Sequence, residues 1–172
     1  EMNLSQKSLE ECNPSPAVPS VLVVGIGNPL RADDAAGHLV AEGLGRRNLS
    51  FLKIVEHLGD GASLMALWGN TKTVIVVDAV VSGAVPGTIH RIDAIKDPLP
   101  VWLSEVSTHG LGLAQAVELA RVMNQLPRRL IIYGIEGRSF EAGGELSSEV
   151  RAAVSQAVDR VVEEAHTDVR NP

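Results

Sequence analysis

The chain has 172 residues, of which 45% are hydrophobic and only 3% aromatic, and its formal net charge is −6. This length fits one domain with a substantial core, and the dominance of Val, Ala and Leu suits helices packed on a parallel sheet. The acidic balance, with no basic patch, argues against a nucleic-acid binder, and no apolar run is long enough to span a bilayer.

The N-terminal segment is polar, contains the single cysteine Cys12, and lacks the basic and apolar regions of a secretory signal. We therefore expect a flexible tail over 1–19, one domain over 20–165 and a second tail over 166–172, in a cytoplasmic protein. One cysteine cannot form an intramolecular disulfide, and nothing near Cys12 in the sequence would lower the pKa of its thiol for catalysis.

Apolar runs that alternate with amphipathic segments predict a doubly wound α/β fold. The predicted strands are 20–25, 51–56, 73–78, 88–92 and 130–135. Two predicted helices follow Asp33–Asp34 and Gly61, and two more span 111–123 and 148 to about 165. Asp33 or Asp34 is the expected cap of the first helix, which is expected to end near Gly43 or Gly45. The short strand at 88–92 follows a Pro-Gly turn signal, so we place it antiparallel at an edge. The expected architecture is a single-domain, three-layer α/β/α sandwich with a mostly parallel twisted sheet and one antiparallel edge strand.

The most informative segment is 21–34, VLVVGIGNPLRADD, an apolar strand that breaks at Gly-x-Gly and ends in two carboxylates. Gly-x-Gly after a strand is typical of phosphate sites, but Asp33 and Asp34 would repel a phosphate and attract a cation. The dinucleotide fingerprint also fails, because Leu30 stands where its third glycine belongs. The P-loop Gly-Lys-Ser/Thr, the Gly-x-Ser-x-Gly elbow and the His-Glu-x-x-His helix are absent from the sequence.

Three residues could meet at one edge of the predicted sheet. Asp34 follows the first strand, Asp78 ends the 73–78 strand, and His109 stands just before a helix. Ligands of open α/β sheets bind beyond the carboxyl ends of the strands, and two carboxylates with an imidazole leave coordination positions open for water or substrate. Each residue also has an ordinary interpretation: Asp34 as a helix cap, Asp78 as an acceptor for loop amides, and His109 as a cap or a surface side chain.

Other polar residues near this edge receive weaker assignments. We expect Asp33 to be exposed with a capping role and Asp60, between two glycines, to lie at the same edge as a second-tier candidate. Asn28 is expected to hold its turn through side-chain bonds to the backbone, with a hydrogen bond to the backbone of a substrate as the alternative. The histidines without a partner pattern are expected to be surface or structural residues: His38, His57, His90 and His166.

Three segments resemble the hydrogenase maturation proteases, the endopeptidases that process the large subunit of nickel–iron hydrogenases. They are GIGNPLRADDAAG at 25–37, VVDAV at 76–80 and STHGLGL at 107–113, in the order and spacing of that family. The resemblance covers nearly everything from 20 to about 162. It implies that the metal-binding trio of the family falls on Asp34, Asp78 and His109, although some members carry Glu at the first of these positions and have Asp-Gly-Gly where this chain has Gly-Asp-Gly.

The resemblance also implies a substrate and a chemistry. The expected substrate is a nickel–iron hydrogenase large-subunit precursor that already carries nickel, and the expected reaction removes its short C-terminal extension. The nickel would come with the precursor, would be recognised by the trio, and would not be tightly resident in the enzyme. We expect a monomer without nucleic-acid or membrane partners.

Two other functions are compatible with parts of the sequence. A non-catalytic checkpoint chaperone could bind the nickel-loaded precursor with the same residues. A small flavodoxin-like nucleotide-binding domain is disfavoured by Asp33 and Asp34 in the position of the phosphate.

Overall fold

The computed structural model describes residues 21–69, 71–105 and 111–170. The strands in these ranges are β1 (Val21–Ile26), β2 (Leu52–His57), β3 (Thr73–Val80), β4 (Ile89–Asp93) and β5 (Arg129–Glu136). The helices are the 3₁₀-helix η1 (Ala32–Ala35), α1 (Ala36–Arg47), α2 (Gly61–Trp68), α3 (Val101–Glu105), α4 (Leu113–Val122) and α5 (Ser148–Arg170).

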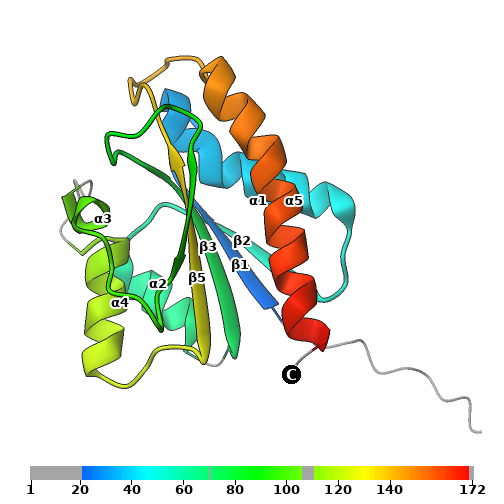
Figure 1. Cartoon of the computed structure of the whole chain (residues 1–172), viewed down its shortest axis with the longest axis vertical. Coiled ribbons are helices and arrows are strands. Elements are labelled where there is room, and N and C mark those ends of the chain that lie inside the picture. The colour runs from blue at the N-terminus through cyan, green and yellow to red at the C-terminus, as the bar shows by residue number, and fades with distance from the viewer. Residues whose placement is uncertain (1–20, 70, 106–110, 171–172) are drawn as a thin grey trace, which may run out of the picture.

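The strands form one sheet in the order β2-β1-β3-β5-β4. β1, β2, β3 and β5 run parallel, whereas β4 runs antiparallel to β5 with Ile89 opposite Ile135. Helices α1 and α5 cover one face of the sheet and α2, α3 and α4 cover the other (Figure 1). The predicted three-layer sandwich with an antiparallel edge strand is therefore confirmed.

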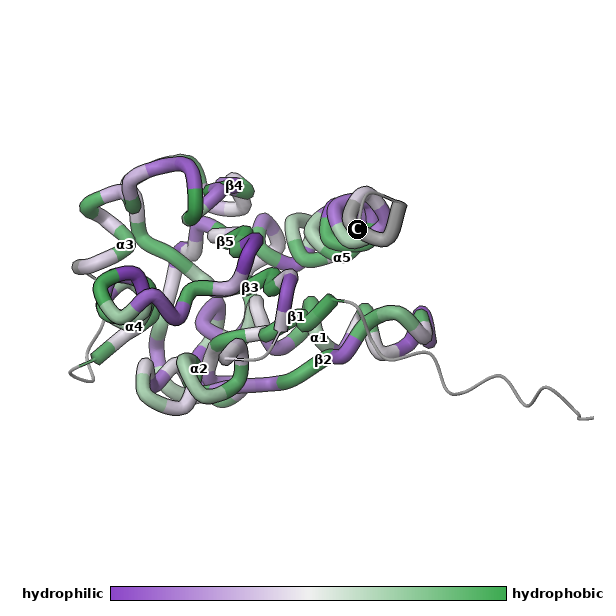
Figure 2. Tube along the Cα trace, turned by 90° about the horizontal axis from the view of Figure 1, so that it is seen from below, coloured by the Kyte–Doolittle hydropathy of each residue, from purple (hydrophilic) through white to green (hydrophobic). Residues whose placement is uncertain are grey.

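Two hydrophobic clusters, one on each face, explain why the strands read as continuous apolar runs. In β3, Ile75 and Val77 pack beneath α1 and α5, while Val74 and Val76 pack beneath α2 and α4. Successive side chains of a strand point to opposite faces, so a doubly covered strand must be apolar at every position. Figure 2 shows the central strands between these two helical layers.

Helix α1 lies unusually close to the sheet at Gly37. A Cβ atom at this position would collide with the carbonyl oxygens of Ile26 and Val77. The close approach fixes the start of α1, and hence the η1 turn before it, against the carboxyl halves of β1 and β3.

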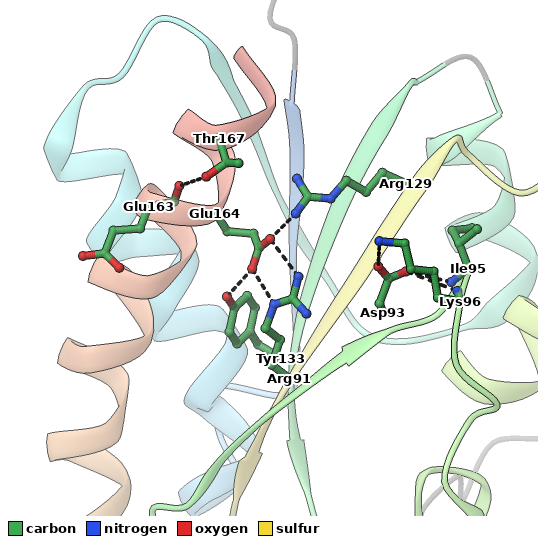
Figure 3. A network of polar contacts seen from close by, with 9 residues as sticks. All are labelled: Arg91, Asp93, Ile95, Lys96, Arg129, Tyr133, Glu163, Glu164 and Thr167. Carbon is green, nitrogen blue, oxygen red and sulfur yellow. Dashed lines mark hydrogen bonds and ion pairs between the residues drawn. The ribbon is translucent and has the colours of Figure 1, made fainter. Parts of the chain in front are cut away.

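Helix α5 is attached to the sheet by a polar network around Glu164 (Figure 3). The Glu164 carboxylate accepts hydrogen bonds at 2.6 and 2.9 Å from Arg91 and at 2.7 Å from the hydroxyl of Tyr133, and it also pairs with Arg129. The Arg91 bonds, followed by the bond from Tyr133, lower the pKa of Glu164 to about 2 although its burial opposes the shift. The network therefore keeps Glu164 ionised and joins α5 to β4 and β5.

Several predicted boundaries are wrong in informative ways. Helix α1 does not end at Gly43 or Gly45 but continues to Arg47, where Asn48 adopts the left-handed conformation that terminates it. The predicted cap is also wrong, because neither Asp33 nor Asp34 caps α1. Asp33 bonds to a distant loop instead, and α1 continues directly from η1 with Ala35 at its N-cap.

Two other elements run longer than the sequence indicated. Strand β3 continues to Val80, so Asp78 lies within the strand rather than at its end. Helix α5 continues to Arg170, past the domain boundary expected at 165. The expected N-terminal tail over 1–19, with Cys12, lies outside the described residues.

None of the helices described here has both the length and the apolar character that crossing a bilayer requires.

Candidate functional site

The turn after β1 presents Asp34 at the carboxyl edge of the sheet. Gly27 adopts a φ of 143°, and a Cβ atom there would collide with the carbonyl oxygen of Asp34, so only glycine allows the chain to fold back this closely. The backbone N–H of Asn28 points at Oδ2 of Asp34 at 3.3 Å. The half-buried carboxylate of Asp34 is thus held over the end of β1.

Asp78 lies on the neighbouring strand, β3, opposite Gly134 of β5. Its side chain is half-buried among fully buried neighbours. Burial, followed by the negative charge of Asp34, raises the pKa of Asp78 to about 7, and a hydrogen bond from the backbone of Ala79 only partly offsets this. The structure therefore brings Asp34 and Asp78 within electrostatic reach of each other, as the sequence predicted for these two residues.

The third predicted residue, His109, lies outside the described residues, but the chain beyond it does not. Asp78 lies on the same face of the sheet as Val74, Val76 and Val80, the face covered by α2 and α4, because every second residue of a strand points to one face. Leu111, two positions after His109, lies on the same face, where its carbonyl oxygen accepts a 2.7 Å bond from the N–H of Gly61. The meeting of His109 with the two carboxylates stays a prediction.

Within residues 21–69, 71–105 and 111–170, no group of three or more His, Cys, Asp or Glu side chains is arranged to hold a metal ion. The predicted trio has only two members in these ranges. Two adjacent carboxylates, one with a raised pKa, are nevertheless a donor set that suits a divalent cation, because a cation relieves their mutual repulsion.

The sequence predicts an exposed Asp33, and this prediction is wrong. Asp33 is completely buried. Its carboxylate accepts three backbone N–H bonds: from Arg138 at 2.8 Å, Ser139 at 3.0 Å and Ser147 at 2.8 Å. Burial acts to raise the pKa of Asp33, but these backbone donors outweigh it and hold the pKa below its usual value. Asp33 thus ties the η1 turn to the loop between β5 and α5.

A second buried carboxylate, Glu136, organises the loop after β3. It accepts bonds from the backbone N–H of Ser82 and Gly83 at 2.9–3.0 Å and from the Ser82 hydroxyl at 2.6 Å. His90 lies 3.4 Å from the same carboxylate, and its ring contacts Trp102 of α3 at a centroid distance of 5.0 Å. His90 is therefore a structural residue, as expected.

The loop after β2 has its own hydrogen-bond chain. Nδ1 of His57 accepts the N–H of Gly59 at 2.8 Å, and its Nε2 lies 2.7 Å from the hydroxyl oxygen of Ser63. Ser63 in turn bonds to Asp60, which is the N-cap of α2 and is largely exposed. Asp60 therefore has a structural role here. The expected role of Asn28 is confirmed, because its Oδ1 accepts the N–H of Leu30 at 2.9 Å.

A cavity of about 410 Å³ opens beside the turn that carries Asp34. The loop after β1, the first turn of α1, and the end of β2 with the loop after it supply its walls, which are Gly27, Pro29, His38, Glu56, His57, Leu58 and Asp60. His38 and Glu56 approach each other to 3.4 Å at its rim, and Leu58 is 78% exposed. The volume and mixed lining suit a side chain or a short peptide segment.

Comparison with known proteins decides the family. The family model described as hydrogenase maturation protease matches residues 40–164, well over half of the chain. The chain belongs to the hydrogenase maturation protease family. Hydrogenase 2 maturation protease of Escherichia coli strain K12 is 29% identical over 145 residues, covering 83% of this chain and 88% of that protein.

Solved structures of this family share the fold. The hydrogenase maturating endopeptidase HybD from E. coli superposes with a TM-score of 0.71 at 27% identity, covering 86% of this chain and 93% of that one. The [NiFe] hydrogenase maturation protease HycI from Thermococcus kodakarensis KOD1 gives a TM-score of 0.66 at 25% identity, covering 84% and 91%. As a member of this family, the chain is a protease.

Sequence reasoning missed the two buried carboxylates that support the site. Asp33 is expected from the sequence to be an exposed capping residue, and Glu136 lies just after the predicted strand at 130–135 and receives no assignment. The local sequence carries no signal for either role, because their backbone donors lie 105–114 and 53–54 residues away.

Proposed function

We propose that this hydrogenase maturation protease is an endopeptidase that removes the C-terminal extension of a nickel-loaded hydrogenase large-subunit precursor. Asp34, Asp78 and His109 bind the nickel that the precursor carries and thereby recognise a loaded substrate. The observation that carries this proposal is the pairing of Asp34 with Asp78, whose pKa rises to about 7 through burial and the Asp34 charge. The reaction takes place in the cytoplasm, and the protein acts as a monomer.

The pairing gives a physical reason for nickel recognition. Two neighbouring carboxylates in a half-buried site repel each other, so one of them holds a proton near neutral pH. A divalent cation between them removes that repulsion and releases the proton, which favours a loaded precursor over an empty one. Carboxylate and imidazole ligands hold a cation weakly on their own, so the thiolates of the precursor complete its binding.

The residues divide the chemistry between them. Nickel, when it arrives with the substrate, polarises the scissile carbonyl and lowers the pKa of a bound water. Asp34 and Asp78 orient that water, and one of the two carboxylates accepts its proton as the water attacks the carbonyl carbon. The proton then passes to the leaving amine when the C–N bond breaks, and the half-buried position of Asp78 limits competing solvent. The cavity beside Asp34 accommodates the precursor segment that flanks the scissile bond, with Pro29 and Leu58 as its apolar walls.

The test is incubation of the full chain with the C-terminal part of a candidate large subunit, with and without nickel, followed by mass measurement. We expect a shortened precursor only in the sample with nickel. Cleavage that is equal without nickel would refute nickel recognition. Binding of the precursor without any loss of mass would instead indicate a checkpoint chaperone.

A further inference from the structure

The turn that presents Asp34 is conformationally strained. Ala32, two residues before Asp34, has a φ of 42°, which residues other than glycine, Asn and Asp rarely adopt. A strained backbone persists only where surrounding contacts over-determine it. Contacts from elsewhere in the fold must therefore hold this turn.

The strongest contacts converge on one side chain. Asp33, between Ala32 and Asp34, is completely buried and accepts three backbone N–H bonds of 2.8–3.0 Å from Arg138, Ser139 and Ser147. Its own N–H donates to the carbonyl of Ser139 at 3.0 Å. A buried carboxylate is costly unless its oxygens are satisfied, so the geometry of the η1 turn and that of the distant loop determine each other.

Two further residue pairs attach the same loop to the same turn. The guanidinium of Arg31 donates to the carbonyl of Phe140 at 3.2–3.3 Å, and the N–H of Gly143 donates to the carbonyl of Leu30 at 2.8 Å. Both involve residues earlier in the turn. Asp33 is the contact adjacent to Asp34 in sequence, so it has the most direct control of where the Asp34 carboxylate lies.

We propose that Asp33 is a positioning residue, whose buried carboxylate clamps the strained turn to the β5–α5 loop and so fixes Asp34 beside Asp78. This inference rests on the proposed function for its link to activity, while the clamp itself can be tested without any substrate. Asp33 touches neither the substrate nor the cation and acts only through Asp34.

The test uses Asp33→Asn in the full chain. The new amide presents N–H toward at least one backbone N–H donor, so the clamp loosens without a change in side-chain size. Misplacing a reacting group by about 1 Å can cost up to about 100-fold in rate. We therefore expect kcat on the nickel-loaded precursor fragment to fall about tenfold or more, with KM changed by less than about twofold.

A substrate-free measurement accompanies the kinetics. The N–H of Asn28 lies 3.3 Å from Oδ2 of Asp34, so its amide signal in an NMR spectrum reports where that carboxylate lies. We expect the Asn28 signal to shift and its hydrogen exchange to accelerate in Asp33→Asn. If the wild type fails to cleave the precursor, the proposed function fails, but this readout still decides whether the clamp exists.

A matched control and a rescue separate positioning from general stability. Glu149→Gln removes a carboxylate that pairs with Arg138 at 2.9 Å on the same loop, and it should leave kcat and the Asn28 signal unchanged. Adding Ala32→Gly to Asp33→Asn should recover at least about threefold in kcat, because glycine adopts a positive φ without strain. If Asp33→Asn alone does not fold, the kinetic and NMR measurements are made on the double variant.

The inference is overturned if folded Asp33→Asn keeps both the wild-type kcat and the wild-type Asn28 signal. It is equally overturned if Asp33→Asn only lowers the thermal midpoint while the folded protein retains its kcat, or if the double variant folds and recovers nothing.

Discussion

Asp34 and Asp78 share one electrostatic environment: burial and the negative charge of Asp34 together raise the pKa of Asp78 to about 7. The two carboxylates come from different elements, η1 and β3, and meet where the carboxyl ends of the parallel strands lie. A folded protein that keeps such a pair sacrifices some stability for it, which makes the pair measurable in a stability experiment as well as in an activity assay.

Asp78→Asn should abolish conversion of the nickel-loaded precursor yet stabilise the protein at pH 8. The pKa of Asp78 is higher in the folded than in the unfolded chain, so the folded state binds more protons between about pH 4 and 7 and loses stability as pH rises through that window. A pKa shift of one unit corresponds to about 1.4 kcal/mol. After allowance for relaxation of the half-buried site, we expect a gain on the order of 2 kcal/mol at pH 8 by chemical denaturation.

The control for this prediction is Asp97→Asn, at an exposed position outside the helices and strands. It should change neither stability nor conversion. An Asp78→Asn variant that is less stable than the wild type at pH 8 would show that the charge of Asp78 is compensated in the folded protein.

Nickel binding by the protein without precursor should weaken as pH falls from 8 to 6. A proton on Asp78 competes with the cation, and with a pKa of about 7 the carboxyl is mostly protonated at pH 6. We expect the nickel affinity measured by titration calorimetry to fall about tenfold from pH 8 to pH 6. In Asp78→Asn this pH-dependent loss should be smaller. Equal affinity at both pH values would mean that the cation does not contact this pair.

Leu58→Glu should lower kcat/KM for the precursor by about tenfold without lowering the thermal midpoint, because Leu58 lines the cavity beside Asp34 and is 78% exposed. A charged side chain there opposes entry of the substrate segment. The matched control is Val122→Glu on α4, which is 80% exposed and does not line that cavity. Loss of activity in both variants to the same extent would remove the cavity from the substrate path.

Glu164→Gln should destabilise the protein by roughly 2–4 kcal/mol above pH 5, because it leaves the guanidinium of Arg91 and the hydroxyl of the buried Tyr133 without the carboxylate that they bond to. The pKa of Glu164 falls to about 2 in the folded protein, so its contribution is present above the unfolded value near 4.5 and is lost as pH falls toward 2. Urea denaturation across this range measures it. Glu163→Gln, one position earlier with an exposed side chain, is the control and should have little effect (Figure 3).

The layers of the fold could be predicted from the sequence because hydrophobic periodicity is a local property. The continuous apolar runs at β1, β3 and β5 required cover on both faces, and the Pro-Gly signal before β4 marked the reversed edge strand. The end of α1 could not be predicted from its glycines. Gly43 lies inside the helix, because the close packing of α1 against Val158 of α5 leaves no room for a Cβ atom at this position.

The candidate site was predictable only in part for the same reason. Asp34 and Asp78 follow from the rule that parallel strands end at one edge, which needs only element order. The supporting roles of Asp33 and Glu136 depend on backbone N–H donors far along the chain, and the sequence next to these two residues does not indicate those donors. Long-range hydrogen bonds to single carboxylates are visible only once the chain is folded.

The most direct test of the account is a crystal structure of the full chain with nickel at pH 8, with the ion located by anomalous scattering. We predict one strong peak with an Oδ atom of Asp34, an Oδ atom of Asp78 and a ring nitrogen of His109 each within about 2.0–2.2 Å, as for other carboxylate and imidazole ligands of divalent metals. A nickel peak held by other residues, with His109 turned away from the two carboxylates, would contradict it.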